Sequence, residues 1–157
     1  MDNFKNPQLF QGQLRQTKAY LHFEDGVTFQ GFINRSKDDL ELKNGIWGEA
    51  AFTTGMSGYE ESSTDPSFLG QHIIFSSSHI GNYESNKRVA QSSKVHGKTL
   101  IARHFSPNDF LENVNVPLFS GLDTRALVTF LSTGEKSHKS VITTDPAPPL
   151  DTEFDQC

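Results

Sequence analysis

The segment "KAYLHFEDGVTFQGF", residues 18–32, decides how this chain folds. Leu21 and Phe23 alternate with polar neighbours before the pair Asp25-Gly26, and the alternation resumes after it. A period of two is typical of a strand that buries one face, and Asp-Gly between two such runs is typical of a tight turn. The segment therefore predicts a β-hairpin closed by a type I′-like turn.

Further short strands are indicated by apolar runs along the chain. They are predicted at residues 48–54, 71–78, 98–105 and 140–143. Residues 115–121 fit either a short strand or an extended segment, and Gly81-Asn82 is predicted to turn the chain. The charged stretch at residues 34–45 is predicted to be a solvated loop.

One helix is predicted, over residues 121–134. Asp123 can accept a backbone N–H at its start, and Gly134 stands where a left-handed residue commonly ends a helix. The apolar residues that share one face at helical spacing are Leu127, Phe130 and Leu131. Many short strands with few helices place the chain in the β-rich α+β class.

Composition narrows the class of protein. The chain has 157 residues, a net charge of −5 and 34% hydrophobic residues, with 13 Phe, which suits one folded domain. The acidic balance, without a basic stripe, argues against a nucleic-acid partner. No apolar run has the length of a membrane span, and the polar start differs from a signal peptide, so we expect a cytoplasmic protein. A single Cys excludes a disulfide framework and a Cys-based zinc site.

The end of the chain, residues 144–157, holds three prolines and four acidic residues. Proline cannot donate to a sheet ladder, and this composition is a poor start for a helix. The stretch is therefore predicted to be an interdomain linker. Cys157 at its end has no neighbouring base in sequence that would activate it as a nucleophile.

The segment "GMSGYEESSTDPSFLGQ", residues 55–71, carries more turn-forming residues than an ordinary connection needs. Ser57 and Glu60 fit a capping box, which predicts a helical turn starting there. Asp65 precedes Pro66, so the first turn is short, and Asp65 is predicted to cap a second turn.

That second turn places the N–H and hydroxyl of Ser67 near a helix start, where donors face outward. Two interpretations of the loop follow from the residues alone. It is either a structural ledge or a ledge whose serine contacts a ligand.

Five motifs, in a fixed order, resemble one family. They are "LHFEDGVTFQG", "GEAAFTTGMSGYEESSTDPSFLGQHIIFS", "HIGNYESN", "VHGKTLIAR" and "GLDTRAL", within residues 21–127. On these motifs the chain is similar to the N-terminal domain of the small, glutamine-hydrolysing subunit of carbamoyl-phosphate synthetase. The long block around "TDPS" is the most specific of the five.

The resemblance implies an α+β domain of the swivelling β/β/α type over residues 1–145, with residues 146–157 beginning an interdomain linker. It implies docking on the large synthetase subunit and on a C-terminal amidotransferase domain of the same polypeptide. In the family that domain hydrolyses L-glutamine, and the resemblance implies that Ser67, the Ser of "TDPS", contacts this substrate. No catalytic residue, cofactor or metal site is implied in this chain. ATP and metal belong to the large subunit, which makes carbamoyl phosphate for arginine and pyrimidine synthesis.

Two other hypotheses remain open. A stand-alone interaction module that kept the fold is motivated by Lys87 and Arg88, which stand where the family carries acidic residues, and by a short segment at 104–120. A serine hydrolase that uses Ser67 with a distant His would need a nucleophile elbow, and no such motif is present.

Other candidate groups have simpler interpretations. His72 and His79 lack a third ligand that would converge with them, so no metal site is predicted. Asp123 and Arg125 could hold an anion, but a helix cap beside an exposed Arg is the simpler reading. Trp47 is predicted to cover an edge of the core, with a partner contact as the alternative.

Overall fold

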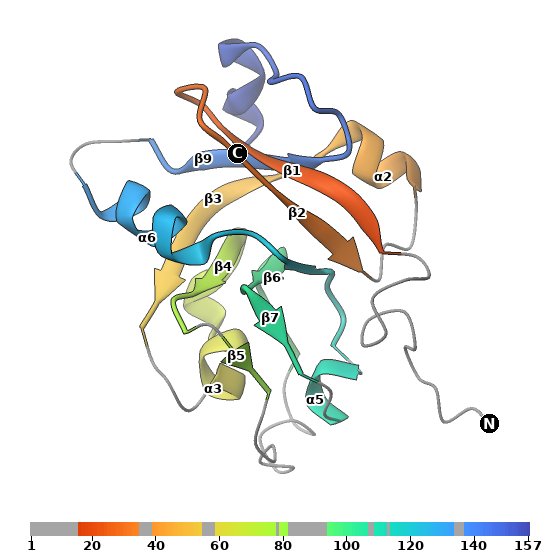
Figure 1. Ribbon diagram of the computed structural model, residues 1–157, viewed down its shortest axis with the longest axis vertical. Coiled ribbons are helices and arrows are strands. Elements are labelled where there is room, and N and C mark those ends of the chain that lie inside the picture. The colour runs from red at the N-terminus through yellow and green to blue at the C-terminus, as the bar shows by residue number, and fades with distance from the viewer. Residues whose placement is uncertain are drawn as a thin grey trace.

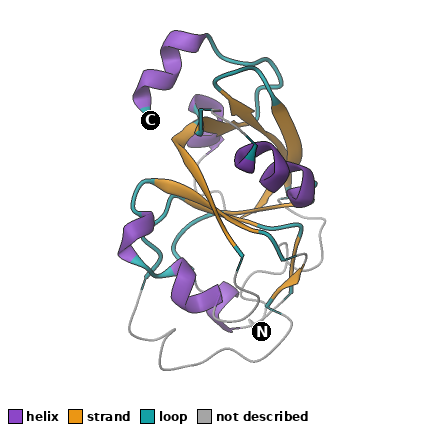
Figure 2. Ribbon diagram, turned by 90° about the vertical axis from the view of Figure 1, so that its left-hand side faces the viewer, coloured by secondary structure: helices purple, strands orange, loops and turns teal. Residues whose placement is uncertain are grey.

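The computed structural model describes most of the chain. The described residues are 16–34, 39–54, 59–77, 79–81, 94–106, 109–112, 114–133 and 137–157. Strands form the centre of the molecule, and Figure 2 shows the helices around their outside. In these ranges no helix is long and apolar enough to cross a membrane.

Within the described residues, seven strands close into a barrel in the order β1-β2-β8-β6-β4-β3-β9 (Figure 1). Their bounds are β1 Thr17–Phe23, β2 Thr28–Asn34, β3 Ile46–Thr53, β4 Gln71–Phe75, β6 Thr99–Ile101, β8 Leu118–Ser120 and β9 Lys139–Thr143. The pairs β3–β4, β4–β6 and β6–β8 are parallel, and the other neighbours are antiparallel. Closure pairs each of these seven strands with a neighbour on both sides, which protects their edges from pairing with another chain.

A separate parallel pair consists of β5 (His79–Ile80) and β7 (His104–Phe105). The helices are α2 Asp39–Asn44, α3 Tyr59–Ser63, α5 Asp109–Glu112 and α6 Thr124–Ser132, with 3-10 helices η1 Pro66–Phe68 and η2 Asp151–Gln156. Figure 1 places β5, β7, α3 and α5 together below the barrel. The β-rich α+β prediction is confirmed.

The predicted hairpin is present as β1 and β2, but its turn differs from the prediction. The N–H of Gly26 donates to the carbonyl of Phe23 at 2.9 Å, and the N–H of Phe23 donates to Val27 O at 2.9 Å. These bonds define a three-residue loop that ends in a glycine bulge, with Gly26 at φ +94°. The type I′ assignment was wrong because Glu24 joins the loop, which moves the left-handed position to its last residue.

Two apolar clusters lie on the two sides of the barrel wall. The inner cluster takes at least one side chain from every barrel strand, for example Leu21, Ile74 and Ile142. The outer cluster includes Ile73 and Leu100 and joins the wall to α3, α5, β5 and β7. Neighbouring residues of β4 and β6 therefore bury opposite faces, which explains the consecutive apolar residues 73–75 and 100–101.

The predicted helix is α6, and its cap is confirmed. The carboxylate of Asp123 accepts the N–H of Ala126 at 3.0 Å. Leu127 and Leu131 are buried in the inner cluster, and the half-buried Phe130 packs against it. The proposed C-terminal Gly134 lies outside the described residues.

Two segments differ from the sequence prediction. Residues 39–44 of the predicted solvated loop form α2, because burial of Leu42 in the inner cluster stabilises this helical turn against the barrel. The predicted single strand at 98–105 is divided between β6 and β7, which belong to different sheets. The assignment failed because sheet membership depends on partners that are distant in sequence.

The C-terminal stretch is more ordered than its composition suggests. Residues Asp151–Gln156 form η2, whose Phe154 is 1% exposed. The ring of Phe154 meets the ring of Trp47 edge to face, with centroids 5.3 Å apart. The expectation of a poor helix start is wrong for η2, because an aromatic anchor holds it against β3.

Candidate functional site

Residues Asp65–Gly70, here called the ledge, connect α3 to β4 and contain the predicted cap. The side chain of Asp65 accepts the backbone N–H of Ser67 at 2.9 Å, and Pro66 occupies the first turn of η1. The carbonyls of Asp65 and Pro66 accept the N–H groups of Phe68 and Leu69, both at 3.1 Å. The predicted Asp-Pro-Ser turn is confirmed.

The ledge is fastened at both ends. Phe68 is half-buried and packs against the outer cluster, which also holds the buried ring of Tyr59 from α3. Gly70 takes φ +79° and leads directly into the barrel strand β4. These anchors leave Ser67 exposed and Leu69 72% exposed. The ledge therefore exposes the Ser67 hydroxyl and the Leu69 side chain to solvent, while its backbone is fixed in position.

The Asp65 carboxylate is stabilised in its charged form. The backbone N–H of Ser67 is the largest cause that lowers the pKa of Asp65, followed by the Ser67 side chain, while partial desolvation opposes them. The nearby His96 lowers the same pKa by its charge. Asp65 therefore caps the turn as an anion at neutral pH.

The first predicted turn is described only in part. Helix α3 begins at Tyr59, near the predicted start, while Ser57 of the capping box lies outside the described residues. Within α3, the hydroxyl of Ser63 donates to the carbonyl of Tyr59 at 2.6 Å. Both residues are buried, so α3 is a fixed support for the ledge.

His72 and His79 lie on different sheets, and the structure does not bring them together. His72 faces the barrel interior and is fully buried. Burial lowers its pKa to about 3, the cation of Lys98 lowers it further, and the backbone of Ile46 opposes both. In the described part of the chain, neither ring nitrogen has a hydrogen-bond partner of good geometry. His72 is thus a neutral, enclosed imidazole that no substrate can reach.

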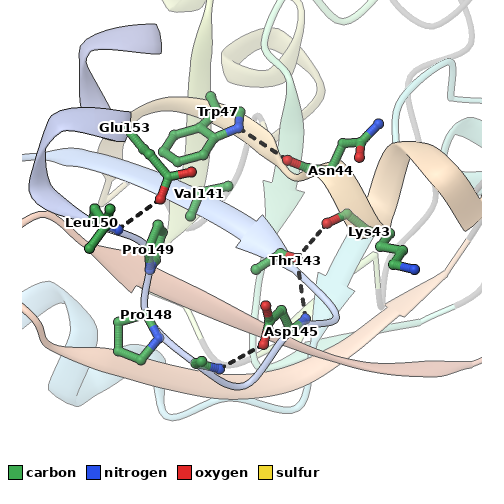
Figure 3. A pocket seen from close by; sticks show the side chains of 11 residues that line it. Lys43, Asn44, Trp47, Val141, Thr143, Asp145, Pro148, Pro149, Leu150 and Glu153 are labelled. Carbon is green, nitrogen blue, oxygen red and sulfur yellow. Dashed lines mark hydrogen bonds between the residues drawn. The ribbon is translucent and has the colours of Figure 1, made fainter.

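Trp47 borders a hollow of about 240 Å³ between β3, β9 and the C-terminal stretch (Figure 3). Its indole N–H donates to Asn44 O at 3.3 Å. Asp145, away from Trp47, accepts the N–H of Ala147 at 2.9 Å, and Glu153, beside Trp47, accepts that of Leu150 at 2.8 Å. These side chains hold the backbone around the hollow, which supports the edge-covering interpretation of Trp47.

The contacts of Asp123 and Cys157 indicate that both residues have structural roles. Asp123 caps α6, while the neighbouring Arg125 is exposed. The thiol of Cys157 donates to Ser140 O at 3.3 Å and to Gly48 O at 3.5 Å. Burial is the main cause that raises the pKa of Cys157, which disfavours the thiolate that a nucleophile requires.

Comparison with known proteins identifies the family. The model of the carbamoyl-phosphate synthase small chain, CPSase domain, matches residues 21–141. The chain belongs to this family. The matched range begins within β1 and ends within β9, so it contains the ledge and nearly the whole barrel. The C-terminal stretch that carries η2 lies beyond it.

Individual relatives agree with this family. The chain is 38% identical over 151 residues to the carbamoyl phosphate synthase small chain of Caldanaerobacter subterraneus, covering 88% of this chain and 40% of the relative. It is 38% identical over 122 residues to the arginine-specific small chain of Bacillus subtilis, covering 71% and 33%. For the small chain of Thermoplasma acidophilum, the identity is 36% over 128 residues, covering 74% and 35%. This chain therefore spans well under half the length of these relatives.

Proposed function

We propose that this chain is the N-terminal domain of the small subunit of a glutamine-dependent carbamoyl-phosphate synthetase. In this proposal, Ser67 contacts L-glutamine bound in a neighbouring amidotransferase domain. The observation that carries it is the exposed Ser67 on a ledge whose backbone is fastened by the Asp65 cap. Family membership over residues 21–141 supports the assignment.

The chemistry of Ser67 suits a role in substrate contact. Its hydroxyl can donate one hydrogen bond and accept two, so it matches the amide, ammonium and carboxylate groups of glutamine. A contact across a domain interface is useful only if it is held in position, because small displacements lower the rate. The cap at Asp65 and the buried side of Phe68 provide that restraint.

Leu69 suits a contact between domains. It is one of three large hydrophobic side chains that are exposed in the described residues, and it lies two positions from Ser67. Packing of the amidotransferase domain over the ledge would remove its apolar surface from water, which is favourable. The same packing would bring a bound glutamine to the serine.

The remaining chemistry is assigned to other parts of the assembly. The amidotransferase domain would release ammonia from glutamine, and the large subunit would combine it with bicarbonate at the expense of two ATP. This chain would supply a docking surface for both and no catalytic group or cofactor site. The complex would act in the cytoplasm and serve arginine and pyrimidine synthesis, and the name of the arginine-specific relative from Bacillus subtilis supports the first pathway.

Reconstitution tests this function. The full-length parent protein is mixed with the large synthetase subunit of the same organism, and carbamoyl phosphate is measured with glutamine or with ammonia as nitrogen source. The proposal expects glutamine-dependent synthesis that requires the small subunit. Co-purification without any glutamine hydrolysis would instead favour the stand-alone interaction module and contradict the proposal.

A further inference from the structure

Two histidines that are distant in sequence meet on the small parallel sheet. His79 of β5 and His104 of β7 are register partners, and their ring centroids lie 4.9 Å apart at an interplanar angle of 59°. Both side chains are exposed. The mechanism assigned to the ledge uses neither of them.

The strand pairing fixes both rings on the same side. Successive side chains of a strand point to opposite faces, and partners in a parallel pair point the same way. The next partners, Ile80 and Phe105, are 1% and 5% exposed and belong to the outer cluster. Their burial anchors β5 and β7, so His79 and His104 are directed together toward solvent.

We propose that His79 and His104 jointly bind one divalent late transition-metal ion, Cu²⁺ or Ni²⁺. A ring nitrogen bound at about 2.1 Å places an ion about 3.2 Å from the ring centroid. Two centroids 4.9 Å apart then subtend about 100° at the ion, between the angles of square-planar and tetrahedral sites. Exposed side-chain torsions allow each ring to direct a nitrogen at this point.

The ligand set determines which ions bind. Neutral imidazole suits Cu²⁺, Ni²⁺ and Zn²⁺, whereas Mg²⁺ and Ca²⁺ prefer oxygen ligands. Among the described residues, no group of three or more His, Cys, Asp or Glu side chains converges. We assign the remaining coordination positions to water, and affinity follows the order Cu²⁺ above Ni²⁺ above Co²⁺.

The bound ion would cross-link two very short strands. β5 and β7 contribute two residues each, which is fewer than most strands have. A ligand that binds only the folded protein stabilises it in proportion to its concentration and affinity. Metal binding therefore raises the unfolding temperature of the protein. Without the ion, the β5–β7 pair is held by the burial of Ile80 and Phe105.

Calorimetric titration tests the site. The untagged 157-residue chain is titrated with NiCl₂ and, separately, with MgCl₂ near neutral pH. One equivalent of Ni²⁺ is expected to bind, with no Mg²⁺ binding. His79→Ala and His104→Ala each remove half of a chelate, so either should weaken Ni²⁺ binding about 100-fold. His96→Ala serves as the matched control, because His96 lies outside the pair, and it should bind Ni²⁺ as the wild type does.

Two results would overturn the proposal. Unchanged affinity in both variants would place the metal elsewhere, and only a twofold loss in each would indicate two independent single-histidine sites. A measurement without substitutions is a second test: substoichiometric Cu²⁺ should broaden the imidazole NMR signals of His79 and His104 first. Broadening that begins at other histidines would contradict the pair as the site.

Discussion

The two 3-10 helices of this chain are built alike and used differently. In η1, the carboxylate of Asp65 accepts a backbone N–H, and no residue of the helix is buried. In η2, the carboxylate of Glu153 accepts the N–H of Leu150, and Phe154 is buried against Trp47. The two helices differ in the side chain that each one places: η1 exposes Ser67 to solvent, whereas η2 buries the ring of Phe154. In η1, the Asp65 cap and the half-buried Phe68 hold the backbone, which leaves the Ser67 side chain available to a partner.

The largest expected effect is a loss of stability when η2 loses its buried aromatic ring, which η1 does not have. Phe154→Ala removes the anchor of η2 and should lower the free energy of unfolding by about 3 kcal/mol, as for other buried Phe residues. Urea unfolding followed by circular dichroism measures this change. Trp47 is the single tryptophan and packs on the lost ring, so its fluorescence should report the detachment directly. A loss below about 0.5 kcal/mol would mean that η2 is not anchored through Phe154.

A smaller effect is expected where the ledge needs glycine. Gly70 takes φ +79°, and an added Cβ there meets no atom within 4 Å. Gly70→Ala should therefore cost about 1 kcal/mol from backbone strain alone. Gly26→Ala is the matched control, because Gly26 has φ +94° and equally open surroundings in the hairpin. Both variants should lose equal stability, and in the proposed two-domain small subunit only Gly70→Ala should lower glutamine hydrolysis, which would assign the defect to the ledge. Equal defects would contradict a special role for it.

The cap of η1 should show in the pH dependence of stability. The pKa of Asp65 is lowered in the folded protein, chiefly by the Ser67 N–H. Its stabilising contribution is therefore complete above the unfolded value of about 3.9 and is lost as the pH falls through the folded pKa. Urea unfolding of Asp65→Asn and wild type should differ near pH 6, and the difference should shrink as the pH falls from about 4 to about 3. A difference that stays constant over this range would show that the charge is not involved.

The smallest effect on stability is expected at Leu69. Because the side chain is 72% exposed, Leu69→Ser should change the free energy of unfolding of this chain by less than about 0.5 kcal/mol. In the proposed two-domain small subunit, the same change should weaken packing of the ledge against the amidotransferase domain and increase proteolytic cleavage between the domains. An unaltered cleavage rate would remove Leu69 from the domain interface.

The helix caps and the hairpin could be predicted from the sequence because they depend on residues that are close together in the chain. Asp65 before Pro66, and Asp123 before an apolar helical face, are caps that act over two or three residues. The alternation around Gly26 predicted the hairpin, although the loop took one more residue than expected. These features depend on neighbours in sequence, which a single sequence shows.

The remaining features depend on distant partners. Charged neighbours concealed the burial of Leu42, which the inner cluster determines. The burial of Phe154 depends on Trp47, and the meeting of His79 and His104 depends on two strands pairing outside the barrel. The proposed role of Ser67 rests on resemblance to a family, because the geometry of the ledge alone fits both a support and a substrate contact.

The most direct test of the account is the Michaelis constant for glutamine in the full-length parent protein, with its large subunit present. Ser67→Ala should raise this constant about three- to tenfold, the value of one hydrogen bond, and leave folding intact. Ser132→Ala, at an exposed serine of α6, is the control and should have no effect. An unchanged constant for Ser67→Ala would contradict the central claim and leave the ledge as a structural support.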